Sequence, residues 1–165
     1  MRSRRLLKQR RHRHWSFIVV TLIAVIGVAG LYVGRTLEPH CTQVEGQGIV
    51  YLPLSQLAAG TARTFCYRDR SGELIRFIVA RDSDGTIHSA FDACRSCFEH
   101  NLGYKLSGAV MICRFCGLRY PLKDMGSGIA SCVPVRLPHL TVPGAVQIKV
   151  ADLEAGRWLF RNKDN

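Results

Sequence analysis

The stretch RFIVARDSDGTIHSAFDACRSC, residues 76–97, decides most of what can be expected of the fold. Two runs rich in β-branched and aromatic residues, RFIVA and TIHSAF, flank the tetrapeptide Asp82-Ser83-Asp84-Gly85. Because Asp, Ser and Gly favour turns, this pattern predicts an antiparallel hairpin. Its second strand leads directly into Cys94 and Cys97. The sequence therefore predicts a β domain that carries cysteines in a loop at one end.

Comparable runs occur on both sides of this hairpin, separated by turns that contain glycine. The hairpin strands are expected at residues 73–82 and 85–91, and further strands at 49–57, 63–69, 108–113, 117–122, 145–150 and 157–162. Only VADLEAG, residues 150–156, has the pattern of a short helical turn, which would end at Gly156. We therefore expect a mostly β fold, a small antiparallel structure with cysteine-bearing loops.

The start of the chain has the pattern of a membrane anchor. Residues 15–34 contain no charged residue, and twenty helical residues span about 30 Å, the thickness of a bilayer core. Residues 1–14 carry seven of the 23 Lys and Arg residues and no acid, so the positive-inside rule keeps this tail cytoplasmic. We predict a single-pass transmembrane helix at 15–35 in a bacterial inner membrane, with the C-terminal part in the periplasm. A cleaved signal peptide is the alternative, but its apolar region would be shorter.

The rest of the chain is expected to divide into a linker and one domain. Residues 36–48 combine Pro39, Gly46 and Gly48 with polar residues, which predicts a short linker before an extracytoplasmic β domain at 49–165. Beyond the tail, 16 Lys and Arg residues stand against 12 Asp and Glu residues, a modest excess of positive charge. This balance argues against a nucleic-acid-binding domain.

Four of the seven cysteines have the spacing of a metal site. Cys94, Cys97, Cys113 and Cys116 form two C-x2-C pairs separated by 15 residues. Two such pairs make a four-thiolate cage, which suits zinc, a single iron or an iron-sulfur cluster. Gly117 follows the second pair, where a positive φ would let backbone N–H groups point at the sulfurs. The alternatives are disulfides, which an oxidising compartment permits, and a thioredoxin-like pair, for which no amphipathic helix follows Cys97.

Several other residues allow two interpretations. Cys41 and Cys66 form a disulfide with each other or are separate buried thiols. His100, three residues after the first pair, is either a metal ligand or a solvated loop residue. Three aromatic residues beside the cysteines are expected to cover the metal with apolar surface: Tyr104, Phe115 and Tyr120.

The chain also resembles a known family. The order RFIVARDSDGTIHSAFDACRSC, LGY, VMICRFCGLRYPL, SCVP and PGAVQIKVADLEAGRWLF is similar to that of the FtrD-like membrane iron-sulfur proteins associated with bacterial ferrous-iron uptake. The resemblance runs from about Ile49 to Phe160 and implies a membrane-anchored, extracytoplasmic metal protein that moves electrons for iron transport. It also implies five family cysteines: Cys94, Cys97, Cys113, Cys116 and Cys132. Around Cys132 this chain departs from the family's usual sequence, with Ser131 and Val133 as the neighbours.

A weaker likeness concerns the layout of the site. A strand pair followed by two cysteine loops is similar to the arrangement in Rieske proteins, with thiols where those proteins have histidines. That likeness implies a small antiparallel β-sandwich whose loops clamp a 2Fe-2S cluster. All-thiolate ligation would lower the reduction potential relative to a Rieske centre, because each thiolate adds negative charge.

Electron transfer is the function that these patterns favour. A cluster on Cys94, Cys97, Cys113 and Cys116 would pass electrons between an integral-membrane partner and a periplasmic one, in support of iron uptake. A second hypothesis is a non-redox module, in which the same thiols hold a structural zinc and the β surface binds a transporter subunit. A metal chaperone is a third, but the sequence has only three Met residues to support it. No Ser-His-Asp set or nucleotide-binding glycine motif occurs, so we expect an electron carrier more than a catalyst.

Overall fold

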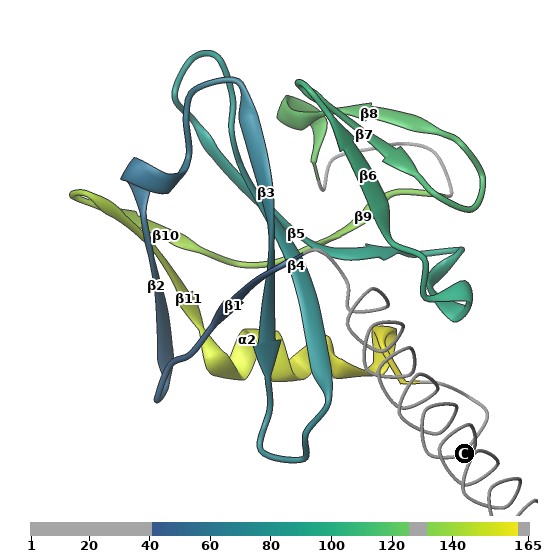
Figure 1. The fold of residues 1–165 in the computed structure, drawn as a ribbon, viewed down its shortest axis with the longest axis horizontal. Coiled ribbons are helices and arrows are strands. Elements are labelled where there is room, and N and C mark those ends of the chain that lie inside the picture. Colours follow the sequence, from purple (N-terminus) through teal and green to yellow (C-terminus); the bar gives the residue numbers. More distant parts are fainter. Residues whose placement is uncertain (1–40, 126–131, 162–165) are drawn as a thin grey trace, which may run out of the picture. The chain divides into compact units, whose positions relative to one another are not determined.

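Three β-sheets make up the part of the chain that the structure, a computed structural model, describes: residues 41–125 and 132–161 (Figure 1). Sheet A has the strand order β1 (Thr42–Val44), β3 (Thr61–Arg68), β4 (Leu74–Arg81), β5 (Ile87–Cys94), β9 (Pro134–Arg136). Sheet B has the order β10 (Leu140–Val142), β11 (Ala145–Lys149), β2 (Ile49–Pro53). Sheet C has the order β6 (Tyr104–Ser107), β7 (Val110–Cys113), β8 (Arg119–Pro121). Every pair in these sheets is antiparallel except β1 with β3, which confirms the mostly β, largely antiparallel prediction.

The predicted hairpin is the β4–β5 pair at the centre of sheet A. Arg81 lies opposite Ile87 at the turn, and the two strands stay in register to Phe77 opposite Phe91. The carboxylate of Asp82 closes the turn, because it accepts hydrogen bonds from backbone N–H groups two and four residues later. The turn residues that predicted the hairpin therefore also form its hydrogen bonds.

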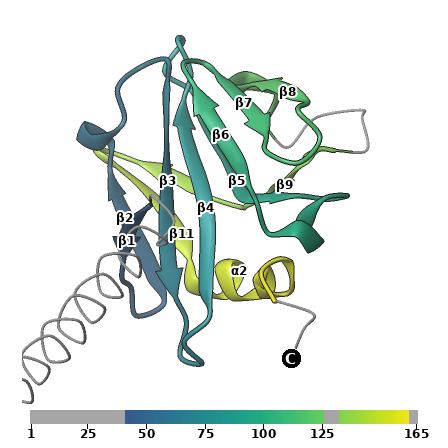
Figure 2. The same cartoon turned by 45° about the vertical axis from the view of Figure 1, so that its right-hand side comes forward.

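Sheet A lies between two hydrophobic cores, and β4 contributes to both. Because side chains alternate across a strand, Ile75, Phe77 and Val79 enter one core, which sheet B and the C-terminal helix complete. Ile78 and Ala80 point to the opposite face and enter a second core shared with sheet C. Figure 2 shows sheet C on one side of the long strands of sheet A, with β2 and β11 on the other. The nearly continuous apolar sequence of β4 follows from burial on both faces.

The C-terminal part confirms one prediction and corrects another. The helix α2 spans Val150–Ala155 and ends before Gly156, as expected. The strand expected at 157–162 is wrong, since the chain forms a 3-10 turn at Arg157–Leu159. Leu159 and the next residue are both buried, so the apolar residues there do not alternate as in a strand. Other 3-10 turns span Leu54–Gln56, Phe98–His100 and Leu122–Asp124.

The N-terminal side of the domain begins earlier than the sequence indicated. Residues 41–48, expected as part of a linker, include β1, which pairs with β3 along the edge of sheet A. Strands β6, β9 and β10, each three or four residues long, were also not expected. Among the residues that the structure describes, no helix is long and apolar enough to cross a bilayer. The span predicted at 15–35 lies outside those residues.

Candidate metal centre

Five cysteines from three segments converge beside sheet C. Cys94 ends β5 and Cys97 lies in the loop that follows, whereas Cys113 ends β7 and Cys116 lies in the β7–β8 loop. Cys132 comes from a third segment, just before β9. The two loops are neighbours because β6 and β7 pair, with Tyr104 opposite Cys113. The fold thus brings together all five family cysteines that the sequence singled out.

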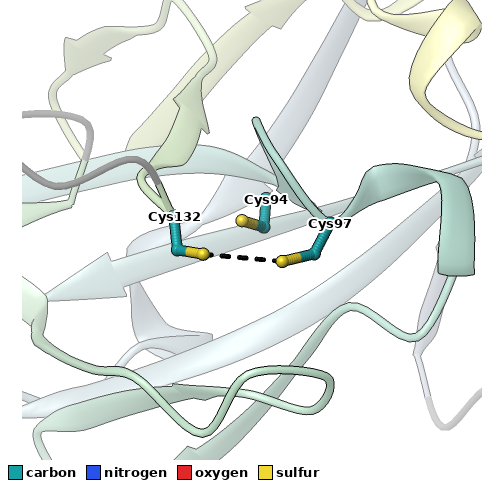
Figure 3. Close-up of side chains that lie close together, drawn as sticks. All are labelled: Cys94, Cys97 and Cys132. Atoms are coloured by element: carbon teal, nitrogen blue, oxygen red, sulfur yellow. Dashed lines mark hydrogen bonds between the residues drawn. The ribbon is translucent and has the colours of Figure 1, made fainter.

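The sulfur atoms form two overlapping groups. The Sγ atoms of Cys94, Cys97 and Cys132 lie within 4.8 Å of one another, and so do those of Cys97, Cys113 and Cys116. Cys132 lies between the two loops, with its Sγ 3.5 Å from that of Cys97 and 3.3 Å from that of Cys116. Figure 3 shows the first group, in which Cys132 and Cys97 point toward each other. Each group offers enough ligands for a metal ion, and Cys97 belongs to both.

Backbone N–H groups point at three of the sulfurs, including both sulfurs of the second pair, where the sequence predicted them. The N–H groups of Ser96 and Cys97 donate to the Cys94 sulfur. In the second loop, the N–H groups of residues 115 and 116 donate to the Cys113 sulfur, and that of residue 118 donates to Cys116. Gly117 has a φ of 74°, a conformation that the tight turn requires and that glycine adopts at little cost. These donors stabilise negative charge on the sulfurs and so favour bound thiolates.

The thiols are too close together to be ionised together unless a cation lies between them. Burial raises the pKa of Cys97 and of Cys113. A hydrogen bond with Cys116, followed by burial, raises the pKa of Cys132 to about 11. Burial also opposes ionisation of Cys94 and Cys116, but on balance the backbone donors lower the pKa of each. Five sulfurs this close cannot all ionise together without positive charge between them, whereas a thiophilic metal deprotonates its ligands. The donor set therefore fits zinc, iron or an iron-sulfur cluster.

A buried ion pair holds the first cysteine loop against sheet A. The Asp92 carboxylate accepts a hydrogen bond of 2.6 Å from the N–H of Tyr104 and pairs with the Arg76 guanidinium at 3.4 Å. Arg76 also donates to the backbone carbonyl and the side-chain oxygen of Asn101, at 2.9 and 2.7 Å. Burial raises the pKa of Asp92 to about 6, although Arg76 opposes the shift. These contacts fix both ends of the loop that carries Cys97.

Sequence reasoning did not single out Arg76 and Asp92. A charged residue at each of these positions interrupts an otherwise apolar strand, and that pattern was the available signal. The other sequence-predicted residues have clear positions. His100 stacks on Phe115 with ring centroids 3.7 Å apart and, within the described residues, belongs to neither group of potential ligands. Tyr104 and Tyr120 are buried beside the thiols, as expected.

The structure also gives the positions of Phe115 and of the two cysteines that do not belong to the thiol cluster, Cys41 and Cys66. Phe115, which was expected to cover the metal, lines the hollow beside Cys97 and Cys113, and 53% of its own surface is exposed. Cys41 and Cys66 form a disulfide, one of the two possibilities that the sequence left open. That disulfide joins the start of the described chain to β3, so these two cysteines do not belong to the candidate metal centre.

Comparison with known families identifies a match over most of this domain. The family model described as "Membrane iron-sulfur containing protein FtrD-like" matches residues 57–160, more than half of the chain. The matched region includes all five clustered cysteines and excludes the disulfide partner Cys41. A comparison with individual curated proteins found no match.

Proposed function

Because the chain belongs to the FtrD-like family of membrane iron-sulfur containing proteins, we propose that it is an extracytoplasmic electron carrier anchored in the bacterial inner membrane. The carrier would use a 2Fe-2S cluster and would serve ferrous-iron uptake through an integral-membrane transporter or redox partner. The observation that carries this proposal is the convergence of five thiols from three segments, because four thiolates are the donor set of an iron-sulfur cluster.

Four of the thiols are the proposed cluster ligands: Cys94, Cys97, Cys113 and Cys116. They come from two loops of similar construction, each with backbone N–H groups that point at its first sulfur. Cys132 lies beside both loops as a fifth thiol and would hydrogen-bond to the bound sulfurs. A cluster held in this way supplies one-electron chemistry, and an all-thiolate set favours a low reduction potential.

The chain's own residues would tune and expose the cluster. Buried Tyr104 and Tyr120 exclude water from the side of sheet C, and the N–H groups at the sulfurs stabilise added negative charge. Cys116 is exposed, unlike Cys94 and Cys113. Electrons would therefore enter or leave on the side of Cys116, where the ligand is closest to solvent.

The location rests on separate evidence. The uncharged run at 15–34 behind the basic tail 1–14 supports a single-pass anchor with its N-terminus in the cytoplasm. The Cys41–Cys66 disulfide supports an oxidising compartment such as the periplasm, because disulfides are rare in the cytosol. The choice of a 2Fe-2S cluster rests on the layout of two cysteine loops beside a small antiparallel sheet, which is similar to that of Rieske proteins.

Metal and sulfide analysis of anaerobically purified full-length protein tests the proposal. We expect coloured protein with about two iron and about two acid-labile sulfide per chain, and a reversible one-electron signal. Colourless protein with one zinc and no redox signal would overturn electron transfer. It would leave the second candidate, a zinc-stabilised interaction module of a membrane transport complex, which the same thiol cage also fits.

A further inference from the structure

Exposed apolar side chains gather around the two cysteine loops. Of the seven large apolar side chains that are exposed in the described residues, four flank these loops: Leu102, Phe115, Leu118 and Trp158. We call this set the cysteine face. Each member has between 44% and 53% of its surface exposed. Single exposed apolar residues are ordinary, but a group of four around a reactive site marks an interaction surface.

The members of the cysteine face are linked through the site itself. Leu102 and Phe115 line the same small hollow between the loops, together with Cys97 and Cys113. Trp158 packs edge-on against Phe98, which lines that hollow too, with ring centroids 5.0 Å apart. The carbonyl of Leu118 accepts a 2.9 Å hydrogen bond from the N–H of Cys113. The apolar surface is therefore continuous with the thiol cluster.

Positive charge surrounds this face. Residues 94–119 contain four basic residues and one acidic residue, Glu99, whereas residues 41–93 contain five basic and six acidic residues. Three of the basic side chains are exposed next to the cysteines: Arg95, Arg114 and Arg119. Bound thiolates would add negative charge behind this surface, but the arginines are on the solvent side and nearer to any partner. A partner that docks here would gain from carboxylates around an apolar centre.

We propose that the cysteine face is the docking surface for a redox protein with an acidic rim and an apolar contact centre. This inference rests on the proposed electron-carrier function. One electron leaves the reduced cluster and reduces the oxidised centre of the partner, with no proton or atom transferred. Cys116, which is exposed, lies within the docked area, so the partner covers the ligand closest to solvent.

A charge-inverted pair of electron acceptors tests the inference. Cytochrome c is basic, and partial succinylation of its lysines gives an acidic form with the same haem. The full-length protein in detergent is reduced with dithionite and freed of excess reductant under anaerobic conditions, and its oxidation by each ferric form is followed by stopped flow. At low ionic strength we expect the acidic form to react about tenfold faster, and salt to remove the difference.

Matched variants test whether the cysteine face, and not another part of the surface, determines the reaction rate. Arg95→Glu with Arg119→Glu should slow the reaction with the acidic cytochrome by about threefold or more. The control Arg63→Glu with Arg70→Glu, at exposed positions in and after β3, should leave it unchanged. Leu118→Ser should slow it as well, whereas Leu140→Ser, an exposed leucine in sheet B, should not.

Several outcomes would overturn the inference. Equal rates with both cytochromes at every salt concentration, in protein with an intact cluster, would exclude an acidic partner and leave the electron-carrier function standing. Protein without a redox-active cluster would instead overturn the function itself. Lipid is the other surface that a basic, apolar face could meet. A blue shift of Trp158 emission in anionic but not zwitterionic nanodiscs, measured in a Trp15→Phe background, would assign this face to the membrane and overturn the proposal.

Discussion

Gly103 is the residue at which the first cysteine loop has the least freedom. Its φ is 65°, and a Cβ built there would lie 2.5 Å from both carboxylate oxygens of Asp92. Those oxygens are already occupied by the Tyr104 N–H and by Arg76. Glycine is therefore required for two independent reasons, its backbone conformation and the close approach of the carboxylate.

Gly103→Ala should consequently lower the free energy of unfolding by about 3 kcal/mol, because the methyl group would break a buried ion pair. Gly108→Ala is the matched control, since Gly108 has a φ of 57° and open space around a Cβ. Gly108→Ala should lower the free energy of unfolding by only about 1 kcal/mol, which is the cost of a Cβ in the left-handed backbone conformation. Urea denaturation measures the free energy of unfolding of both variants. Equal losses would show that the Asp92 carboxylate can move away from the added methyl group without loss of stability.

Cys132 differs from the other four clustered cysteines in its origin. It precedes β9 and contacts one sulfur of each loop, Cys97 and Cys116. If it hydrogen-bonds to the cluster and is not a ligand, Cys132→Ser should keep about two iron per chain and shift the reduction potential. Serine at any of the four proposed ligands should instead abolish the cluster. Iron analysis and potentiometry would contradict this assignment if Cys132→Ser lost its iron and one of the other four variants kept it.

At the scale of elements, β1 depends on a covalent link. It is three residues long and lies at the edge of sheet A, where a short parallel strand contributes little by itself. The Cys41–Cys66 disulfide, with a sequence separation of 25, fixes its start to β3.

Replacing both Cys41 and Cys66 by serine should lower the free energy of unfolding by about 3 kcal/mol, through the added entropy of the unfolded chain. The double variant should keep its iron and its visible spectrum, because the disulfide is separate from the thiol cluster. Thermal denaturation with parallel metal analysis checks both statements, and loss of the cluster in this variant would contradict the separation.

The β9–β10 connection contains a titratable group. His139 is half-buried, and its Nδ1 lies 2.7 Å from the Ser89 hydroxyl, which donates to the carbonyl of Leu137. Burial lowers the pKa of His139 below its usual 6.5, with Arg136 and His88 contributing in the same direction. The unfolded chain therefore binds a proton at a higher pH than the folded chain does.

This difference predicts a loss of stability in mild acid. The contribution of His139 is fully present above pH about 6.5 and decreases as the pH falls below that value. His139→Gln should be less sensitive than the native protein when the free energy of unfolding is compared at pH about 7.5 and about 5.5. Identical pH dependence of the two proteins would show that His139 does not contribute.

The elements that the sequence predicted well are those with a clear local signal. The β4–β5 hairpin has turn residues that form its hydrogen bonds, and α2 ends at a glycine. Strands β1 and β9 depend on pairing partners distant in the sequence, which no local pattern specifies. Strand β10 pairs with its neighbour β11, but it is only three residues long. For the site, cysteine spacing indicated four of the thiols, and the family resemblance added Cys132. The charges of Arg76 and Asp92 in apolar strands were visible in the sequence, but their pairing followed only from the arrangement of β4 and β5.

At the scale of the whole molecule, the two cores have different compositions. The core between sheets A and B contains none of the clustered cysteines, whereas the core between sheets A and C contains Cys94, Cys113 and Cys132. We therefore expect the order of sheet C, but not that of sheet B, to depend on the group that the thiols bind.

Metal removal should accordingly loosen one part of the domain and leave the other folded. After chelation, we expect hydrogen exchange to accelerate in residues 104–122, which contain sheet C, and to remain slow in β3, β4 and β11. Exchange measured by mass spectrometry before and after chelation checks this expectation. Global unfolding would show that the two cores are a single cooperative unit.

The Cys41–Cys66 bond also determines how the domain would respond to mechanical load. A pull transmitted along the chain from its N-terminal side reaches the described domain at Cys41 and passes through the disulfide to Cys66, within β3. β1 is bypassed, and β3 is held by eight paired positions on β4. Tension from that direction would therefore be borne by the longest ladder of sheet A, and the thiol cluster beside sheet C would remain outside the path of the force.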